Sequence, residues 1–575
     1  MLKRASVLSR QAQMCLWLAV MYLARMSLKS ASDFLKTYNK YLCCFRNVFG
    51  CLFMTDHAIN KGFFVEWHDY PLLRLAVFLA FGIVAAVDVA PHVSSMLLFV
   101  IGCVILACMS WCMLRSRNRM QGKNNFLPFG ILSFILSFIL GMFLYVSRYE
   151  RMTSCTRAGK AMYEGVVKGI PKEKRKSWMI RIADAERYDV ILYVGKDTLH
   201  LDEQRALMLA IQEGDTVKAL AQHVHPVVME DEAHRSYAVW LLHSGACATA
   251  YVRPSCILFK VADARLSASD INVRTIQRHL HDLYETNNIN GDAGDVIEAI
   301  TIGRKAGLSE HVQEVYSRAG ASHLLSLSGF HVGIIMIILQ SIMMGQIVDR
   351  RWRKFINVAS LAFLWLFVLM AGLSASLVRA SAMCTVVVAC ALAGRKVNLL
   401  NVCAFAFVAM LCFNPMSLFD VGFQLSFMSV AGIGIYVQLS RMRMPSMRKW
   451  LRPVYNTVAI SMVCTISTAP LVAYHFGCVS LVAVVSNLFA VVLVYVLLAC
   501  AFLWWATLCW DAVNDMITLV LAKTTGWLNG LMEYLSSLPF AVIEWHPGAL
   551  ATVGSYLCLI AMVSLFTLSF ERRKI

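Results

Sequence analysis

Residues 93–146 read VSSMLLFVIGCVILACMSWCMLRSRNRMQGKNNFLPFGILSFILSFILGMFLYV, which is two long apolar runs joined by a short basic link. Each run is long enough to cross the hydrocarbon core of a bilayer as a helix, which takes roughly 20 residues. The link at 115–124 carries four positive charges and no acid, and loops of this kind stay in the cytoplasm. The second run therefore leads outward, and we expect the chain after Ser147 to begin on the outer side of the membrane.

The composition agrees with a membrane protein. Of 575 residues, 58% are hydrophobic and only 15% are charged, which excludes an ordinary soluble globular protein. Much of the net charge of +18 lies in loops that should face the cytoplasm, so the charge alone does not indicate nucleic-acid binding. The 19 cysteines are scattered through apolar runs without a CxxC pair. We therefore expect neither a metal site nor a cofactor.

Similar apolar runs lie on both sides of the quoted stretch. One precedes it at 71–90, and the later ones lie at 321–344, 355–372, 376–394, 398–413, 421–439, 454–474, 480–506 and 548–570. Alternate loops between them are basic, as is the tail at 571–574, so we expect a cytoplasmic C-terminus. This parity needs one more crossing within 507–547, where charged residues leave a plain span, a re-entrant pair of helices and a surface helix all open. The sequence predicts a polytopic α-helical membrane protein with about 11–12 transmembrane helices.

A water-soluble β domain is predicted between the two membrane blocks. The apolar runs shorten there, and strand-like stretches lie at 163–168, 178–182, 189–194, 215–222 and 248–252. Because Gly, Pro and charged turns separate them, this pattern predicts a mostly antiparallel sheet on the periplasmic side. Cys247 and Cys256 flank one predicted hairpin, where an oxidising compartment would allow a disulfide; two separate thiols fit the sequence equally well.

The remaining segments complete the domain organisation. Residues 273–305 have the pattern of an amphipathic helix that lies on the surface. The first 60 residues are basic, and their apolar stretches are short, so we expect the native start further along, near Met54. The predicted domains are an N-terminal extension at 1–69, three transmembrane helices at 70–147, the β domain at 148–265, amphipathic helices at 266–320, a second helical membrane domain at 321–570 and a cytoplasmic tail at 571–575.

Polar side chains inside the second membrane domain are the candidates for function, because such groups are costly in lipid unless they face protein or water. The first patch, SHLLSLSGFHVG at 322–333, places Ser328 and His331 three residues apart on one face of a helix. His323 lies eight residues before His331, about 12 Å along a helix, which is too far for one shared metal ion. The Ser328–Gly329 pair predicts a broken helix that lines a wet path. Alternatively, His323 lies at the membrane interface and the serines bond back to the helix.

Two further polar patches follow the first. GLSASLVRA at 372–380 places Arg379 in a span, and NPMSLFDVGFQLSF at 414–427 contains Asp420 and Gln424, four residues apart on one helix face. The loop parity puts Arg379 and Asp420 near the outer ends of their spans, so an ion pair between them fits the sequence. Such a pair would serve either the contact between helices or transport.

These three patches, in this order, closely resemble the motifs of the ComEC family of bacterial competence membrane channels. The resemblance covers about residues 70–570. It implies that the protein passes single-stranded DNA across the cytoplasmic (inner) membrane during natural transformation. The residues that match the motifs, and so the candidate channel residues, are His323, Ser326, Ser328, Gly329, His331, Gly333, Arg379, Asn414, Asp420 and Gln424.

The resemblance also implies an OB-like fold for the periplasmic β domain. OB folds bind single strands through a basic groove and stacked aromatic rings. The candidate DNA contacts, for which a solvated loop is the alternative, are Lys172, Lys174, Arg175, Lys176 and Trp178. The implied partners are single-stranded DNA, a DNA receptor, a cytoplasmic translocase, a separate nuclease and a second copy of the chain.

One departure from the family pattern concerns nuclease activity. Many members carry a C-terminal metallo-β-lactamase-like domain, but HVHP at 223–226 and HLHD at 279–282 do not reproduce its HxHxDH signature. We therefore expect a channel rather than an enzyme. Two other functions stay open: a small-molecule or lipid exporter, and an intramembrane hydrolase that uses Ser328 and His331. The hydrolase lacks a Gly-x-Ser-x-Gly motif.

Overall fold

The computed structural model describes residues 70–571, which all belong to one compact unit, Lys61–Ile575. Its gaps are 118–126, 155–160, 169–170, 175, 185–188, 197–200, 212–214, 222, 227–234, 254–256, 262–267, 288, 306, 344–349, 396–397 and 443–450. The predicted N-terminal extension at 1–69 and most of the predicted tail lie outside the described residues.

Three apolar helices open the described chain. They are α3 (Pro71–Val89), α4 (Ser95–Arg117) and α5 (Leu127–Ser154). The helices α3 and α5 pack closely because glycines face the neighbouring backbone. A Cβ at Gly82 would lie 2.0 Å from the carbonyl oxygen of Phe138, and a Cβ at Gly141 would lie 2.3 Å from that of Leu79. Small residues allow this close approach between membrane helices.

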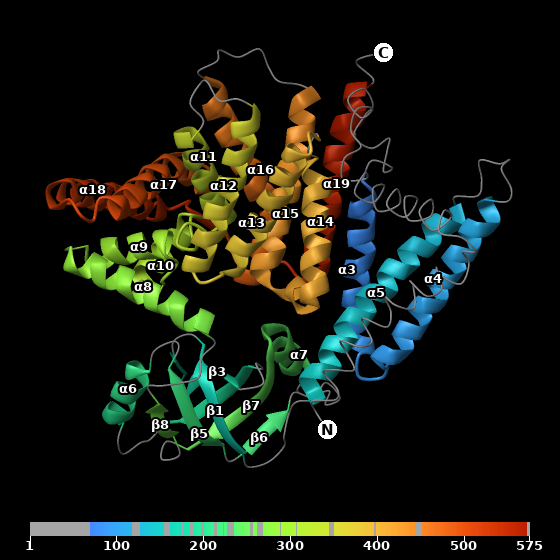
Figure 1. The fold of residues 1–575 in the computed structure, drawn as a ribbon, viewed down its shortest axis with the longest axis horizontal. Coiled ribbons are helices and arrows are strands. Elements are labelled where there is room, and N and C mark those ends of the chain that lie inside the picture. Colours follow the sequence, from blue (N-terminus) through green and yellow to red (C-terminus); the bar gives the residue numbers. More distant parts are fainter. Residues whose placement is uncertain are drawn as a thin grey trace. The chain divides into compact units, whose positions relative to one another are not determined.

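The second membrane block contains the later apolar helices (Figure 1). They are α11 (Gly329–Met343), α12 (Arg350–Met370), α13 (Ala375–Leu392), α14 (Leu399–Phe413), α15 (Val421–Met442), α16 (Leu451–Phe476), α17 (Ala483–Ala506), α18 (Asp511–Ser536) and α19 (Ala549–Glu571), with the short 3-10 helix η4 (Pro415–Phe419) between α14 and α15. In the described part of the chain, seven helices are long and apolar enough to cross a membrane, and four shorter apolar helices accompany them. This confirms the predicted class, a polytopic helical membrane protein.

The stretch 507–547, which the sequence left open, contains one long helix rather than a pair. The helix α18 packs against α17, and its inner face buries Leu521, Leu528 and Met532. With 26 residues it is long enough to cross a membrane, but it is not among the seven described helices that are also apolar enough to do so. Beyond it, β10 (Val542–Glu544) pairs with β9 (Cys478–Ser480), which connects the end of α18 to the end of α16.

The helices between the β domain and the second membrane block are α8 (Ala268–Thr286), α9 (Gly291–Thr301) and α10 (Glu310–Arg318). They occupy the region for which the sequence predicts amphipathic helices. Their apolar side chains are not simply laid on a surface, because α9 and α10 pack against α18 and α9 also contacts α17. Ile297 and Ile300 of α9 are fully buried in the same cluster as Trp504 of α17.

The β domain is an eight-stranded mixed sheet. Its elements are β1 (Ala161–Val167), β2 (Lys172–Glu173), β3 (Ser177–Asp184), β4 (Asp189–Gly195), α6 (Leu201–Ala210), β5 (Thr216–Ala221), β6 (His223–Pro226), α7 (Arg235–Ser244), β7 (Ala246–Val252) and β8 (Ile257–Val261). The strand order is β6-β7-β4-β3-β1-β5-β8, with β2 beside β3. Every predicted stretch corresponds to a strand, and the pairing is antiparallel except between β4 and β7. This sheet is larger than the five-stranded barrel of an OB fold.

Candidate functional site

The first polar patch forms a capped helix start. The helix α11 begins at Gly329 rather than near 321, because residues 322–326 form turns and bends and residues 327–328 are irregular. The backbone N–H of Ser328 donates to Nδ1 of His331 at 3.1 Å, and the Ser328 hydroxyl lies 3.0 Å from the same nitrogen. The backbone N–H of His331 donates to the Ser328 carbonyl oxygen at 3.1 Å. The bond from the Ser328 N–H to the His331 side chain is one half of a capping box, with histidine in the place of the usual Glu or Gln. The other half differs, because the His331 N–H bonds to the Ser328 carbonyl oxygen and not to its hydroxyl.

The arrangement fixes the tautomer of His331. Because Nδ1 accepts a hydrogen bond from a backbone N–H, the proton of the neutral ring is on Nε2. His331 is fully buried, and Nε2 has no hydrogen-bond partner among the described residues. A buried donor without a partner is costly, typically about 1–3 kcal/mol. The patch therefore presents one unsatisfied N–H inside the apolar helices.

The other residues of the first patch lie apart from His331. His323 is exposed in the turn, and its carbonyl oxygen accepts a hydrogen bond from Ser326 Oγ at 3.3 Å. Gly333 is exposed, with no atom within 4 Å of where a Cβ would lie. Gly329 has a packing role, because its Cβ would lie 3.3 Å from the Cβ of Ala380 in α13. This contact brings the first patch beside the second, where Arg379 precedes Ala380.

Arg379 and Asp420 do not form the ion pair that the sequence allowed: among the described residues, no contact within 4.0 Å joins their charged groups. Arg379 is 4% exposed, donates from Nη2 to the carbonyl oxygen of Gly422 at 3.0 Å and lies 5.9 Å from the ring centroid of Phe423. Asp420 instead accepts the backbone N–H of Phe423 at 2.7 Å, which caps α15. The two motifs thus meet through the backbone of α15 rather than through two charges.

In the third patch, Gln424 contacts His475, a residue too distant in the sequence for spacing to predict the contact. Gln424 donates from Nε2 to the carbonyl oxygen of Leu418 at 3.0 Å, and its Oε1 lies 3.1 Å from Nε2 of His475 in α16. Asn414 ends α14, and its carbonyl oxygen accepts the N–H of Ser417 at the start of η4. These polar groups hold the break between α14 and α15 in place.

The helix α7 connects the β domain to this break. The imidazole of His243 stacks on Phe419 of η4, with ring centroids 3.7 Å apart and planes at 5°. Nε2 of His243 lies 3.1 Å from the hydroxyl of Tyr145 in α5. Burial lowers the pKa of His243 to about 4, so the stacked ring is neutral at pH 7. Sequence analysis missed this junction because its members come from segments about 100 to 270 residues apart.

We expect acidification to weaken the α7 junction. The pKa of folded His243, about 4, lies below the ordinary value of 6.5, so its stabilising contribution is present above pH 6.5 and is lost as the pH falls towards 4. Hydrogen exchange of the amides of residues 235–245, corrected for the intrinsic pH dependence of exchange, should accelerate about tenfold or more across this window. His243→Phe keeps a stacked ring that does not titrate. Equal acceleration in that variant would contradict the assignment.

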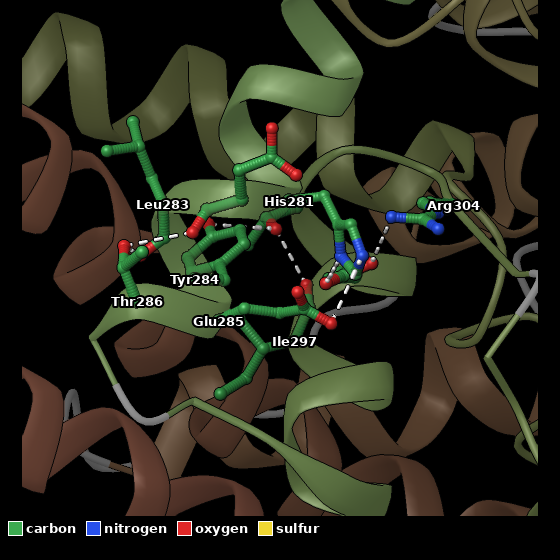
Figure 2. Close-up of polar contacts among 10 residues, drawn as sticks. His281, Leu283, Tyr284, Glu285, Thr286, Ile297 and Arg304 are labelled. Carbon is green, nitrogen blue, oxygen red and sulfur yellow. Dashed lines mark hydrogen bonds and ion pairs between the residues drawn. The ribbon is translucent and has the colours of Figure 1, made fainter.

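A polar cluster that sequence analysis also missed joins α8 to α9 (Figure 2). Nδ1 of His281 lies 2.6 Å from Oε1 of Glu298, and Nε2 lies 3.4 Å from Oε1 of Glu285. Arg304 approaches the other oxygen of Glu298 at 3.7 Å, and the Glu298 side chain is only 8% exposed. Burial and the neighbouring Asp292 raise the pKa of Asp295 on the same helix. The signal in the sequence was Glu298 itself, an acid in the apolar run 296–300.

The helix α8 and the residues that follow α9 lie beside the first two polar patches. Gln277 of α8 donates from Nε2 to the carbonyl oxygen of Ile302 at 3.2 Å, and a Cβ at Gly372, which has φ +81°, would lie 3.2 Å from that Nε2. A Cβ at Gly303, which has φ +77°, would lie 2.8 Å from Cδ1 of Leu327. The described residues contain no group of three His, Cys, Asp or Glu side chains that could hold a metal ion.

The predicted DNA contacts of the β domain are only partly accessible. Lys172, Lys174 and Lys176 are exposed, whereas Arg175 lies outside the described residues. Trp178 is 3% exposed, so its ring is not available to stack on a base. It lies in the apolar core because successive side chains of a strand point to opposite faces.

A disulfide and two separate thiols both stay open for Cys247 and Cys256. Cys247 is buried in β7, and its Sγ lies 3.5 Å from the carbonyl oxygen of Asp189. Cys256 lies outside the described residues.

Comparison with known proteins identifies the second membrane block. Residues 300–570 match the family model described as "Competence protein". "ComE operon protein 3" of Bacillus subtilis (strain 168) is 24% identical over 479 residues, which cover 78% of this chain and 55% of that protein. The chain thus spans about half the length of this relative. No solved structure matches the chain. The match confirms the resemblance of the three patches, because residues 300–570, which contain them, are similar to the competence proteins of the ComEC family.

Proposed function

We propose that the protein is a channel that passes single-stranded DNA across the cytoplasmic membrane during natural transformation. The observation that carries this proposal is the meeting of the first two polar patches at one helix contact. Gly329 of α11 approaches Ala380 of α13, which places the buried His331 and the buried Arg379 on neighbouring helices. Ionisable residues within membrane helices are rare, and they often mark the path of a polar substrate or an ion.

The chemistry of this contact suits a polyanion. Phosphates that leave water need cations and hydrogen-bond donors along their path. Arg379 supplies a guanidinium whose Nε is buried without a partner among the described residues, and His331 supplies the unsatisfied Nε2–H. Both groups can donate to phosphate oxygens, and neither is consumed by an ion pair. The path therefore offers donors that are already desolvated.

The wider setting follows from this role. The β domain, in the place of the OB-like module that the family resemblance implies, would receive the strand on the outer side, and the C-terminus would lie in the cytoplasm. A DNA receptor, a cytoplasmic translocase and a separate nuclease would act with the channel. The printed name of the relative, an operon protein, supports the existence of such partners for that protein. The protein would act as a conduit and not as an enzyme.

An intramembrane hydrolase is the second candidate, because Ser328 Oγ lies 3.0 Å from Nδ1 of His331. A serine nucleophile needs a free ring nitrogen to take its proton. Here Nδ1 already accepts the backbone N–H of Ser328 at 3.1 Å, as part of the start of α11. The capping geometry accounts for the short distance, so the channel remains the better proposal.

Deletion of the gene in a naturally transformable host tests the proposed function. Labelled DNA should still reach the periplasm of the deletion strain, while DNA in the cytoplasm and the number of transformants should fall to background. Arrest before the periplasm, or normal transformation, would refute the proposal. A serine-directed fluorophosphonate probe that labels Ser328 would favour the hydrolase instead.

A further inference from the structure

The β domain carries a continuous row of aromatic rings next to the α7 junction. Tyr251 of β7 stacks on Tyr193 of β4, with centroids 5.5 Å apart and planes at 24°. The hydroxyl of Tyr193 lies 2.7 Å from that of Tyr237 in α7, and Tyr237 stacks on Trp240 with centroids 5.8 Å apart. Lys174 holds its ammonium 5.2 Å above the Tyr193 ring. We call these four rings and the lysine the aromatic row.

The sheet register explains why the row forms. Lys172 pairs with Met179, Met179 pairs with Tyr193, and Tyr193 pairs with Tyr251 in neighbouring strands. Residues directly opposite in adjacent strands project from the same face of a sheet. The row therefore lies on the face opposite to Trp178, whose neighbouring position in β3 projects the other way.

The rings at both ends of the row are open to solvent. Tyr237 is 42% exposed, Trp240 is 52% exposed and Tyr251 is 52% exposed. Tyr193 between them is 8% exposed and serves as the fixed base of the stack. Exposed, pre-ordered aromatic rings beside cations are the elements with which proteins bind single-stranded nucleic acids, because every base has a face to stack. The rings could not stack on the bases of a duplex, because neighbouring base pairs cover the faces of those bases.

The position of the row also suits the transfer of a DNA strand from the β domain to the membrane helices. Trp240 lies one helical turn before His243, which stacks on Phe419. Phe419 directly precedes the Asp420–Gln424 segment, whose backbone contacts Arg379. A strand held on the row would thus be bound by the same helix that docks on the third polar patch.

We propose that the aromatic row binds single-stranded DNA by stacking its bases on Trp240, Tyr237 and Tyr251, with Lys174 near the backbone. This inference rests on the proposed function and names the site at which the β domain meets the strand. It replaces the stacking role that the sequence suggested for Trp178. The row recognises bases, so it selects single strands over duplexes and over a bare sugar-phosphate chain.

The test compares binding of two fluorescent oligonucleotides to the full-length chain in lipid nanodiscs. The first is oligo(dT) of about 16 nucleotides, and the second is an abasic chain of the same length. Trp240→Ala/Tyr251→Ala removes two exposed rings of the row. The matched control is Trp527→Ala/Tyr534→Ala on α18, where both rings are also exposed, at 69% and 66%.

The row variant should bind oligo(dT) at least about tenfold more weakly than the unaltered chain, because each stacked base contributes substantially. Its affinity for the abasic chain should be unchanged, and the control variant should bind both as the unaltered chain does. Unchanged binding of oligo(dT) by the row variant would overturn the inference and leave the proposed function standing. An equal loss with both oligonucleotides would also overturn it, since the rings would then act only through the fold. If the unaltered chain binds neither oligonucleotide, the proposed function fails and the inference fails with it.

Discussion

Replacing Arg379 by alanine is expected to lower the yield of transformants to that of the gene deletion, while the protein still inserts into the membrane. The guanidinium is 4% exposed, and it contacts the backbone of Gly422 and the ring of Phe423. A hydrogen bond to a charged group contributes about 1.5–3 kcal/mol, so the variant also loses part of the contact between α13 and α15. The larger effect is on transport, because Arg379 is the only cationic side chain of the second patch, residues 372–380.

Two further variants separate transport from stability. Arg379→Lys keeps the charge and an N–H donor group but loses the planar fork, so we expect it to recover part of the uptake and little of the contact with Phe423. Arg395→Ala removes an exposed arginine beyond the other end of the same helix and should leave uptake unchanged. Transformation and the amount of membrane-inserted protein are measured together. Normal transformation by inserted Arg379→Ala would show that the channel does not use this cation.

The broad architecture could be predicted because it depends on local composition. In lipid, the backbone N–H and C=O groups of an apolar run of about 20 residues must bond to each other, which requires a helix. Each described run after residue 320 indeed contains a helix. The strand-like stretches at 163–168 and 189–194 likewise fall on β1 and β4. Boundaries were less accurate: hydropathy cannot distinguish the non-helical residues 322–328 from helix, because their leucines are as apolar as those of a span.

The candidate site was harder to predict because its contacts join distant segments. Spacing correctly put Ser328 near His331, but only the fold shows that His331 caps the helix. The possible partner of Arg379 was judged by charge, whereas in the structure Nη2 of the guanidinium donates to a backbone carbonyl oxygen. Trp178 was a candidate DNA contact because it is aromatic and near lysines, yet strand alternation places it in the core. The aromatic row needed the register of β4 and β7, which no local pattern contains.

Nε2 of His331, which has no hydrogen-bond partner in the described part of the chain, predicts a second large loss of function. His331→Asn should insert normally and yet lower transformation to the level of the gene deletion. The amide oxygen of asparagine lies where Nδ1 lies in histidine, so it can accept the N–H of Ser328 and preserve the helix cap, which is typically worth about 1 kcal/mol. The variant has nothing that reaches the position of Nε2.

The comparison with His331→Gln and His331→Ala assigns the role of each ring nitrogen. Gln extends an amide towards the Nε2 position and should recover part of the uptake. Ala loses both nitrogens and should lower uptake and thermal stability together. If the only task of His331 were to start α11, the Asn variant would transform normally and the Ala variant would fail in proportion to its lower stability. A uniform loss in all three variants, with stability unchanged in Asn and Gln, would instead require the whole imidazole. Only loss in Asn with partial recovery in Gln supports a buried donor that meets the phosphate backbone.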